Sequence, residues 1–375
     1  MRQLCSWSWV EAQVAQTIEL WNSSAAAWTP AWTPGGPWYS LHQQQAREKA
    51  YDREMRAVEQ EASRAPRSKL ERLAAQDRIT AAFARFSTTA LDLEEDAVRP
   101  LTNDFLPAGT KLARWARQFD PSLSIADIIQ ACRNAWTACG LQALLGEDIG
   151  ITPSILGYSL LYPYSDNYLD RADVSAEAKL SFSDRFRSRL RGERLSREST
   201  REAALSALVS LIEEQYPRAR YPQLYESLLA IHRAQEESVA QIRSCDSSSD
   251  AELLRLSCAK GGSSVLADAC LARGWLNEGE ARFAFEWGVL LQLGDDLQDI
   301  HEDMQRGSAT LFSRAAALGK PLDDLVIQLL NFSERVGTRM DSLPSGSRVL
   351  KELLKMSWRS LIIGAVADSH EILQL

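Results

Sequence analysis

The segment from Leu291 to Asp303, LQLGDDLQDIHED, places five carboxylates among its last nine residues, inside a stretch that is otherwise apolar and helix-forming. On a helix that turns by about 100° per residue, these acids fall within an arc of roughly 100°, which Asp296 widens slightly. The other four acids are Asp295, Asp299, Glu302 and Asp303. Like charges one turn apart repel by about 0.2–0.5 kcal/mol per pair, and no Lys or Arg intervenes before Arg306. The segment therefore predicts a helix whose acidic face binds an external cation.

The type of side chain indicates which cation this is. Hard carboxylate oxygens without a cluster of His or Cys suit Mg²⁺, which usually keeps several waters and is held by one or two carboxylates together with substrate phosphates. The acidic face is thus half of a site, and we expect the other half to be a phosphate ester.

A second acidic segment lies upstream, in LLYPYSDNYLDRADVS. Asp166 and Asp170 are one helical turn apart, and Asp173 is nearly in register with them. If the two acidic helices face each other across a bundle, they enclose a pocket with metal ions along both walls and a diphosphate between them. An acidic helix alone is more often a solvated face. The apolar and aromatic residues around both segments favour the metal site: Tyr162, Tyr164, Tyr168, Leu290, Leu291, Leu293, Leu297 and Ile300.

From Asp120 onward, the chain reads as helix-length segments with apolar residues three and four apart, separated by Pro, Gly or Ser clusters. No segment predicts a strand, and no repeat of fixed period is visible. We expect residues 46–375 to form an all-α domain. Separately, the stretch from residue 41 to residue 85 is expected to form charge-rich, solvated helices. Residues 1–45 are expected to form an N-terminal extension, rich in Trp, that packs on this main body.

Two motifs carry a resemblance to a known superfamily. Asp166-Asn167-x-x-Asp170 resembles the first aspartate-rich motif of class I isoprenoid synthases, with Asn in its second place, and Asp295-Asp296-x-x-Asp299 resembles the second motif of trans-prenyl diphosphate synthases. Asp295, Asp299 and Asp303 also have the spacing of the second metal motif of terpene cyclases. Over about residues 155–315, AKGGSSVLADACL and LLQLGDDLQDIHEDMQRGSATLF are similar to bacterial large-terpene synthases of the tetraprenyl-curcumene type.

The resemblance implies a class I isoprenoid synthase-like helical bundle around a central apolar cavity. Such a bundle binds an allylic prenyl diphosphate of 15 or more carbons with three Mg²⁺ ions and ionises it to diphosphate and a carbocation, which gives a linear or cyclic terpene. The resemblance places the catalytic acids at Asp166, Asp170, Asp295 and Asp299, and adds Asp296 and Asp303 as metal ligands.

Other residues are candidates for the rest of the site. Lys260 lies beside two glycines that are expected to break the helix and open a helix N-terminus, where a diphosphate can bind. Arg306 is expected to bind the diphosphate as well, with Gly307 as the helix C-cap. The expected aromatic lining of the cavity, where a carbocation is stabilised, is Tyr162, Tyr168, Phe285 and Trp287.

Two further polar groups have open roles. His232, Gln235 and Ser238 form a polar stripe that lines the pocket or, by our preference, lies on the surface. The arginines between residues 185 and 201 either close over the diphosphate or, as we prefer for such a mixed-charge run, are solvated.

Composition limits the partners. The net charge of −8 argues against nucleic acid, and the six scattered Cys indicate buried thiols in a reducing cytoplasm rather than disulfides. We expect no transmembrane span and no signal peptide, while peripheral contact with a membrane stays open because long prenyl products partition into lipid. The chain is expected to be a monomer or a homodimer.

Two alternatives to a terpene synthase stay open. One is a prenyltransferase, either chain-elongating or joining two prenyl diphosphates head to head. Residues 109–115, GTKLARW, do not match the motif that elongating enzymes use for a second diphosphate, and the basic residues are few for two such sites. The other alternative is a non-catalytic helical scaffold whose acids are only surface residues.

Overall fold

The computed structural model describes residues 8–25, 39–63, 68–169, 171, 173–196, 199–241 and 249–369. Within these ranges the chain forms helices and no strand, which confirms the predicted all-α class. The chain divides into two compact units, one of residues 1–26 and 111–375 and the other of residues 27–110. The domain boundary expected near residue 45 falls inside a helix of the second unit.

The unit of residues 27–110 is built on a pair of helices, α2 and α3, that pack against each other. Its elements are α2 Leu41–Ser63, α3 Lys69–Thr89, α4 Glu95–Pro100 and the π-helix η1 Leu101–Phe105, and α5 Leu106–Phe119 begins here. Phe86 is buried between the paired helices, with its ring centroid 5.3 Å from that of Tyr51. The other faces of α2 and α3 are largely exposed, as their charge-rich sequence predicts.

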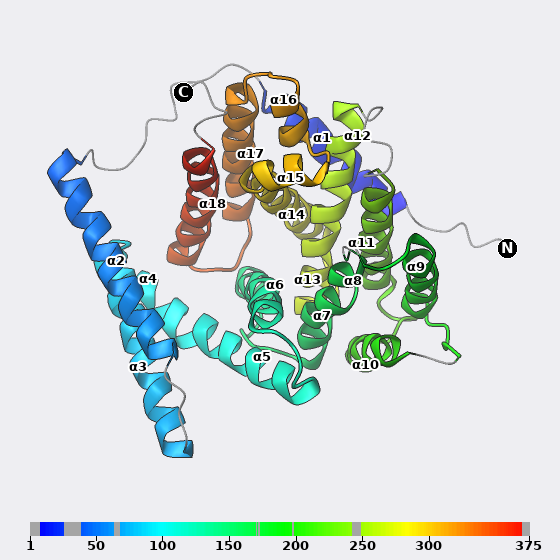
Figure 1. Ribbon diagram of the computed structural model, residues 1–375, viewed down its shortest axis with the longest axis horizontal. Helices are drawn as coiled ribbons and strands as arrows, with labels where there is room; N and C mark the ends of the chain where they lie inside the picture. The colour runs from blue at the N-terminus through cyan, green and yellow to red at the C-terminus, as the bar shows by residue number, and fades with distance from the viewer. Residues whose placement is uncertain are drawn as a thin grey trace. The chain divides into compact units, whose positions relative to one another are not determined.

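The larger unit contains the remaining helices (Figure 1). They are α1 Ser8–Ser23, α6 Ile125–Leu145, α7 Pro153–Tyr164, α8 Asp166–Leu169, α9 Ala176–Leu190, α10 Thr200–Gln215, α11 Pro222–Gln241, α12 Asp250–Ser257, the π-helix η2 Cys258–Gly262, α13 Ser263–Arg273, α14 Glu278–Gln298, α15 Ile300–Arg306, α16 Leu311–Ala317, α17 Asp323–Asp341 and α18 Arg348–Asp368.

Helix α14 forms the centre of this unit. It begins at a capping box, in which Asn277 and Glu280 satisfy each other's backbone N–H groups. Neighbouring helices η2, α13, α17 and α18 all pack against it. Phe283, Phe285 and Leu293 of α14 have no exposed surface, so most of α14 is buried, whereas Asp295 and Gln298 near its C-terminal end are exposed.

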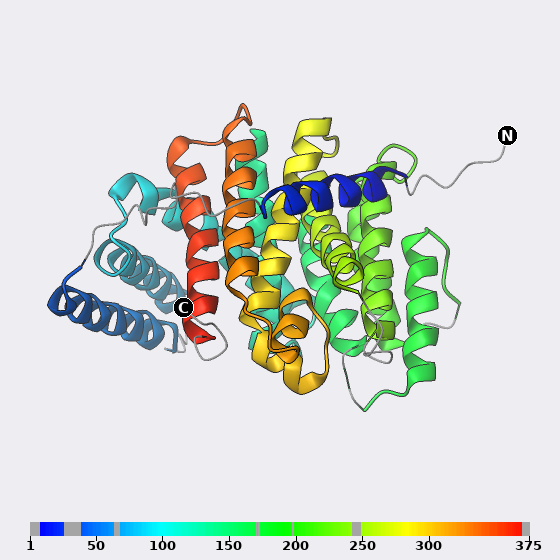
Figure 2. The same cartoon turned by 90° about the horizontal axis from the view of Figure 1, so that it is seen from above.

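Helix α1 lies crosswise over the other helices of its unit (Figure 2). Trp21 is 3% exposed and packs edge to face on Phe332 of α17, at 5.8 Å between ring centroids. Gln328 and Asn331 of α17 donate hydrogen bonds to the carbonyls of Trp21 and Ser24, at 2.8 and 3.1 Å. These contacts attach α1 to the main body; Trp7, Trp28, Trp32 and Trp38 lie outside the described residues. Among the described helices none combines the length and apolarity that a membrane crossing requires.

Candidate functional site

A cavity of about 420 Å³ opens inside the larger unit, within the size range of small-molecule sites. Its wall is built from α6, α7, α8, α9, α11, η2, α13, α14 and α18. Much of the wall is apolar, with residues such as Leu161, Leu228, Ile231, Val265 and Leu291. Both predicted acidic segments reach this cavity, because Asp166 and Asp295 are among its lining residues.

The first acidic segment follows α7 through a tight turn. Thr152 caps the start of α7 and Pro153 occupies its first turn, and the backbone turns at Ser165 before Asp166 begins α8. Asn167 donates a hydrogen bond of 2.9 Å to Asp127 of α6, so the Asn in the second motif position ties α8 to α6. Asp170, predicted as a catalytic and metal-binding residue, lies outside the described residues.

Asp173 does not continue the first acidic row. It follows α8 in a turn, is exposed, and pairs with Arg171. Because the helix ends at Leu169, the helical register that aligned Asp173 with Asp166 in the sequence does not apply.

The sequence predicted that the second acidic segment forms one helix, but in the structure it is divided between two helices. Helix α14 ends at Gln298 and α15 begins at Ile300, with Asp299 at φ −91° and ψ 12° between them. The one-turn spacing nevertheless persists, because the Asp299 N–H donates to the Asp295 carbonyl at 2.9 Å and the Asp303 N–H donates to the Asp299 carbonyl at 2.8 Å. Gly307 ends α15 in the left-handed conformation at φ 67°, which confirms the predicted C-cap.

The acids of this segment hold their charges at a cost. Burial and then the charge of Asp299 raise the pKa of Asp295. Burial and the charge of Glu302 raise the pKa of Asp299. Burial, with the charges of Asp296 and Asp299, raises the pKa of Asp303 to about 7. The repulsion expected from the sequence is therefore present in the fold, and a bound cation would relieve it.

Asp296 is not among the residues that line the cavity. It is 6% exposed, accepts a hydrogen bond of 2.7 Å from Ser257 of α12, and accepts another of 2.8 Å from Gln292. Burial raises its pKa to about 6 although both hydrogen bonds oppose this. The prediction that Asp296 binds metal is thus not supported by its placement, because both carboxylate oxygens are used within the protein.

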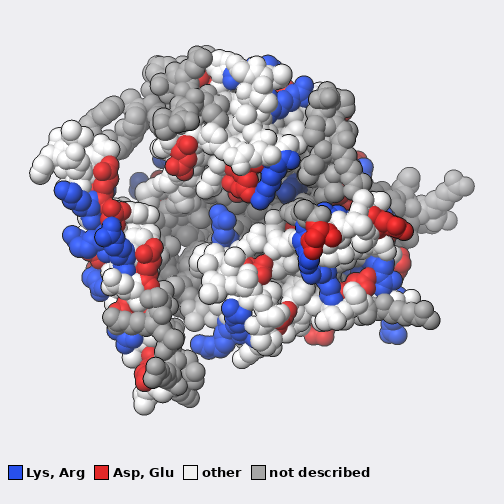
Figure 3. All heavy atoms as spheres, in the orientation of Figure 1, with Lys and Arg blue, Asp and Glu red and all other residues white. Residues whose placement is uncertain are grey.

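Two cations lie by the acids at the cavity. Lys260 and Arg133 both line the wall, and their charges both lower the pKa of Asp295. Arg133 of α6 was not named as a site residue from the sequence; its only signal was a basic residue in an apolar helix. Arg306 is not a lining residue: its side chain is 73% exposed and pairs with Glu302 on α15. Figure 3 shows acidic and basic side chains side by side over this helix.

The glycine pair after Lys260 does not break the helix, which corrects the prediction of a free helix N-terminus. Residues Cys258–Gly262 form the π-helix η2, and Gly262 continues into α13 with helical φ −60° and ψ −47°. A Cβ on Gly261 would lie 2.5 Å from the Gly288 carbonyl oxygen, and one on Gly262 would lie 2.4 Å from the Phe285 ring. The glycines therefore permit close approach to α14, and the π-turn directs Lys260 to the cavity.

The predicted aromatic lining is only partly in place. Tyr162 lines the cavity, but Tyr168, Phe285 and Trp287 do not. Tyr168 packs on Phe182 at 4.7 Å and under Arg201 at 4.6 Å. Phe285 is fully buried against η2, and Trp287 packs between Phe283 and Trp358. Aromatic residues can lie on different faces of a helix, and sequence spacing alone did not show which of them face the cavity and which face the core.

Several polar residues of the wall were missed or misplaced. His232 is 4% exposed and lines the cavity, and Gln235 is 5% exposed, so the predicted surface position of this stripe is wrong. Asp268 and Asn134 line the cavity too and are joined by a hydrogen bond of 3.1 Å. The available signal for Asp268 was a lone acid in the apolar run VLADACLA, since a charged group in such a run is costly unless it has a role.

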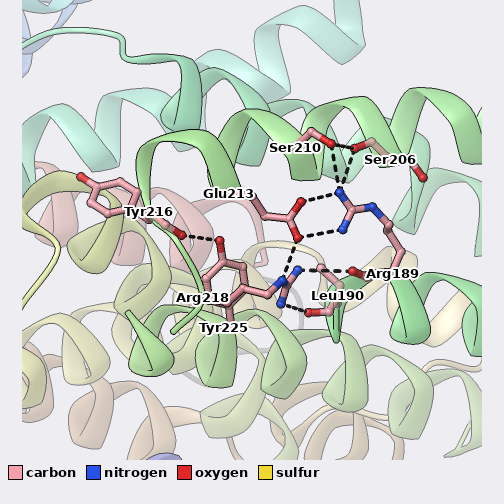
Figure 4. A network of polar contacts seen from close by, with 8 residues as sticks. All are labelled: Arg189, Leu190, Ser206, Ser210, Glu213, Tyr216, Arg218 and Tyr225. Carbon is pink, nitrogen blue, oxygen red and sulfur yellow. Dashed lines mark hydrogen bonds and ion pairs between the residues drawn. The ribbon is translucent and has the colours of Figure 1, made fainter. Parts of the chain in front are cut away.

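Arg185, Arg187 and Arg189 form ion pairs, and neither role predicted for the arginine run fits the most buried of them, Arg189. Arg189 is 9% exposed and binds Glu213 of α10 through two hydrogen bonds of 2.8 and 2.6 Å (Figure 4). Arg218 completes the network, with a bond of 2.7 Å to Glu213 and its guanidinium 3.9 Å above the Tyr225 ring. This network joins α9 to α10 and is not part of the cavity wall. Arg197 lies outside the described residues.

The cavity acids fit Mg²⁺ by their chemistry. In the part of the chain that the structure describes, no three His, Cys, Asp or Glu side chains converge on one metal position. Mg²⁺ does not require such a cluster, because it takes one or two carboxylates and completes its shell with water and substrate phosphates. Asp166 and Asp295 supply such oxygens at one cavity.

A comparison of the chain with family models, curated proteins and solved structures finds no match.

Proposed function

We propose that this protein is a Mg²⁺-dependent class I terpene synthase that ionises an allylic prenyl diphosphate. The observation that carries the proposal is that Asp166 and Asp295, from segments 129 residues apart, line one largely apolar cavity together with Lys260 and Arg133. Carboxylates, cations and an apolar wall are the three components that such a reaction requires.

Each component has a separate task. Asp166 and Asp295 would hold Mg²⁺, which when bound supplies Lewis-acid stabilisation of the diphosphate oxygens. Lys260 and Arg133 would bind the diphosphate and stabilise the negative charge that develops as the C–O bond breaks. The apolar side chains would hold the prenyl chain and keep bulk water from the allylic cation, and the rings of Tyr158 and Phe186 on the wall would attract its charge. No protein nucleophile is needed for this step.

The decisive experiment is release of pyrophosphate from farnesyl, geranylgeranyl and longer prenyl diphosphates, with and without Mg²⁺. We expect Mg²⁺-dependent release, and terpene products identified by mass spectrometry. Assays with added isopentenyl diphosphate distinguish the prenyltransferase alternative, because an elongating enzyme would give a longer diphosphate. Absence of release from every substrate would refute the enzyme hypothesis.

Variants assign the reaction to this cavity. Asp166→Asn and Asp295→Asn conserve side-chain size and should each lower the rate by about 10²-fold or more, since each removes an oxyanion that positions charge at the reacting bond. Asp324→Asn, an exposed acid in the first turn of α17, is the matched control and should keep the full rate. Helical circular dichroism should be the same for all three, and a loss of fold in the cavity variants would make these acids structural.

A further inference from the structure

Asp268 is an acid in the cavity wall that the proposed ionisation does not use. It lies on α13 among buried apolar residues, has no exposed surface, and is among the residues that line the cavity. It belongs to neither acidic motif. A carboxyl group in such a position lowers stability unless something offsets its desolvation.

Its hydrogen bonds are incomplete. Asn134 of α6 donates to Asp268 Oδ1 at 3.1 Å and to Ser159 Oγ of α7 at 3.1 Å. Asp268 Oδ2 is buried, and no partner for it exists among the described residues. An unmade hydrogen bond of this kind is costly, and most buried polar atoms in native proteins have a partner. Because Asp268 lines the cavity, a ligand in the cavity can supply the missing partner.

The protonation of the group indicates what kind of partner fits. Burial raises the pKa of Asp268 well above its ordinary value, although the hydrogen bond from Asn134 opposes this. Burial thus favours the protonated form of the side chain, a carboxylic acid that can donate as well as accept. Ser159, 2% exposed beside it, can do the same. Neutral groups that both donate and accept match a hydroxyl or a water better than they match a phosphate or a cation.

We propose that Asp268, Asn134 and Ser159 form a hydroxyl-binding subsite that holds the oxygen of a water molecule or of a prenyl alcohol in the cavity. Three helices, α13, α6 and α7, supply one residue each, so the subsite is fixed by the packing of the wall rather than by a loop. The shared ligand chemistry is an oxygen that carries at least one hydrogen.

The subsite has a consequence for the product, which rests on the proposed function. Ionisation breaks the C–O bond and leaves the electron pair on diphosphate. A water held by the subsite then forms a new C–O bond to the carbocation, and the proton it loses passes to the departed diphosphate. The product is a terpene alcohol rather than a hydrocarbon, and no oxidant or reductant is needed.

Binding tests the subsite without catalysis. We expect the wild type to bind farnesol about tenfold more tightly than farnesene, the matched hydrocarbon, because one additional hydrogen bond is made. Asp268→Asn, which keeps a donor and an acceptor, should retain this preference, and Asp268→Leu should bind both ligands equally. Ser159→Ala, a smaller change that conserves the core, should reduce the preference if the leucine variant fails to fold. Equal affinities for the two ligands in the wild type would overturn the proposal.

Isotope labelling tests whether the subsite holds a water molecule whose oxygen enters the product. Reaction in H₂¹⁸O should give an alcohol that carries ¹⁸O, and Asp268→Leu should shift the product to hydrocarbon while pyrophosphate release stays within about tenfold. Pyrophosphate release without any preference for farnesol refutes the subsite and leaves the proposed function standing. A preference for farnesol without pyrophosphate release refutes the proposed function and leaves the subsite standing.

Discussion

Acids of the larger unit differ in their partners among the described residues: the buried Glu286 has direct ion pairs, whereas the buried Asp268 and the exposed Asp295 do not. Glu286 has no exposed surface and is bound by Arg282 at 3.0 Å and Arg339 at 2.5 Å. Asp295 and Asp268, at the cavity, have no such direct ion pair among the contacts of the described residues. Breaking a buried pair is strongly destabilising, so acids with a structural role are paired. Acids left without a direct cation partner at a cavity are better explained by a ligand.

Glu236 of α11 belongs to the paired class and gives a pH-dependent prediction. Burial opposes its charge, yet hydrogen bonds from His232 and Arg187 lower its pKa to about 2. A lowered pKa stabilises the fold above the ordinary pKa near 4.5, and this contribution is lost as the pH falls towards 2. Glu236→Gln should therefore lower the free energy of unfolding by about 1–2 kcal/mol at pH 7, which discounts the full shift for partial solvent exposure. The difference should shrink steadily below pH 4.5 in urea titrations.

The next residue provides the control for this measurement. Glu237 pairs with Arg233 and Arg255, whose side chains are 52% and 47% exposed. Glu237→Gln should change the free energy of unfolding by less than about 1 kcal/mol, both at pH 7 and below pH 4.5. Equal losses in the two variants would show that the ion pair to Arg187 has no special weight.

The sequence predicted the roles of residues where the spacing of acids within a motif is sufficient to place them. The pairing of Asp166 with Asp295 at one cavity followed from two motifs, and both residues do line it. The metal role predicted for Asp296 did not anticipate its hydrogen bonds with Ser257 and Gln292, because adjacent acids on a helix point about 100° apart and their partners depend on the fold. Asp268 and Arg133 carried no motif, so their place depended on helix phases that only the fold determines.

At the level of helices, the contact between η2 and α14 positions Lys260. Gly261 and Gly262 on one side and Gly288 on the other let the two backbones approach closely. The sequence indicated that two adjacent glycines are special but suggested a break, because Gly lowers helix stability in isolation. Tertiary packing reverses that preference here, since the absence of side chains is what allows the approach.

Gly288→Ala tests this contact. A Cβ there would lie 2.1 Å from the Gly261 carbonyl oxygen, a backbone atom that cannot rotate away. We expect a loss of about 3 kcal/mol or more in the free energy of unfolding. Gly364→Ala is the matched control: it lies in the exposed part of α18 with open space around it, so alanine should stabilise by about 0.5–1 kcal/mol. Urea unfolding measures both, and similar effects at the two sites would contradict the close approach.

For the whole molecule, the sequence predicted an all-α chain but not its division. Residues 1–26 belong to the same unit as residues 111–375, so one unit interrupts the other in the sequence. Local periodicity cannot predict this interruption. It depends on long-range contacts such as that of Trp21 with Phe332. All residues that line the cavity fall between Gln130 and Leu361, hence within the larger unit.

This division predicts the calorimetric behaviour of the full chain. Two units with separate internal packing should unfold in two transitions rather than one. Mg²⁺ with inorganic pyrophosphate should raise the transition temperature of the larger unit only. The corresponding gain in its free energy of unfolding is about 2.7 kcal/mol when the ligand is present at 100 times its dissociation constant. Gly288→Ala identifies that transition by lowering it selectively, and Asp295→Asn should abolish the ligand-induced shift. A single transition, or a ligand-induced shift of the other one, would contradict the placement of the diphosphate site in the larger unit.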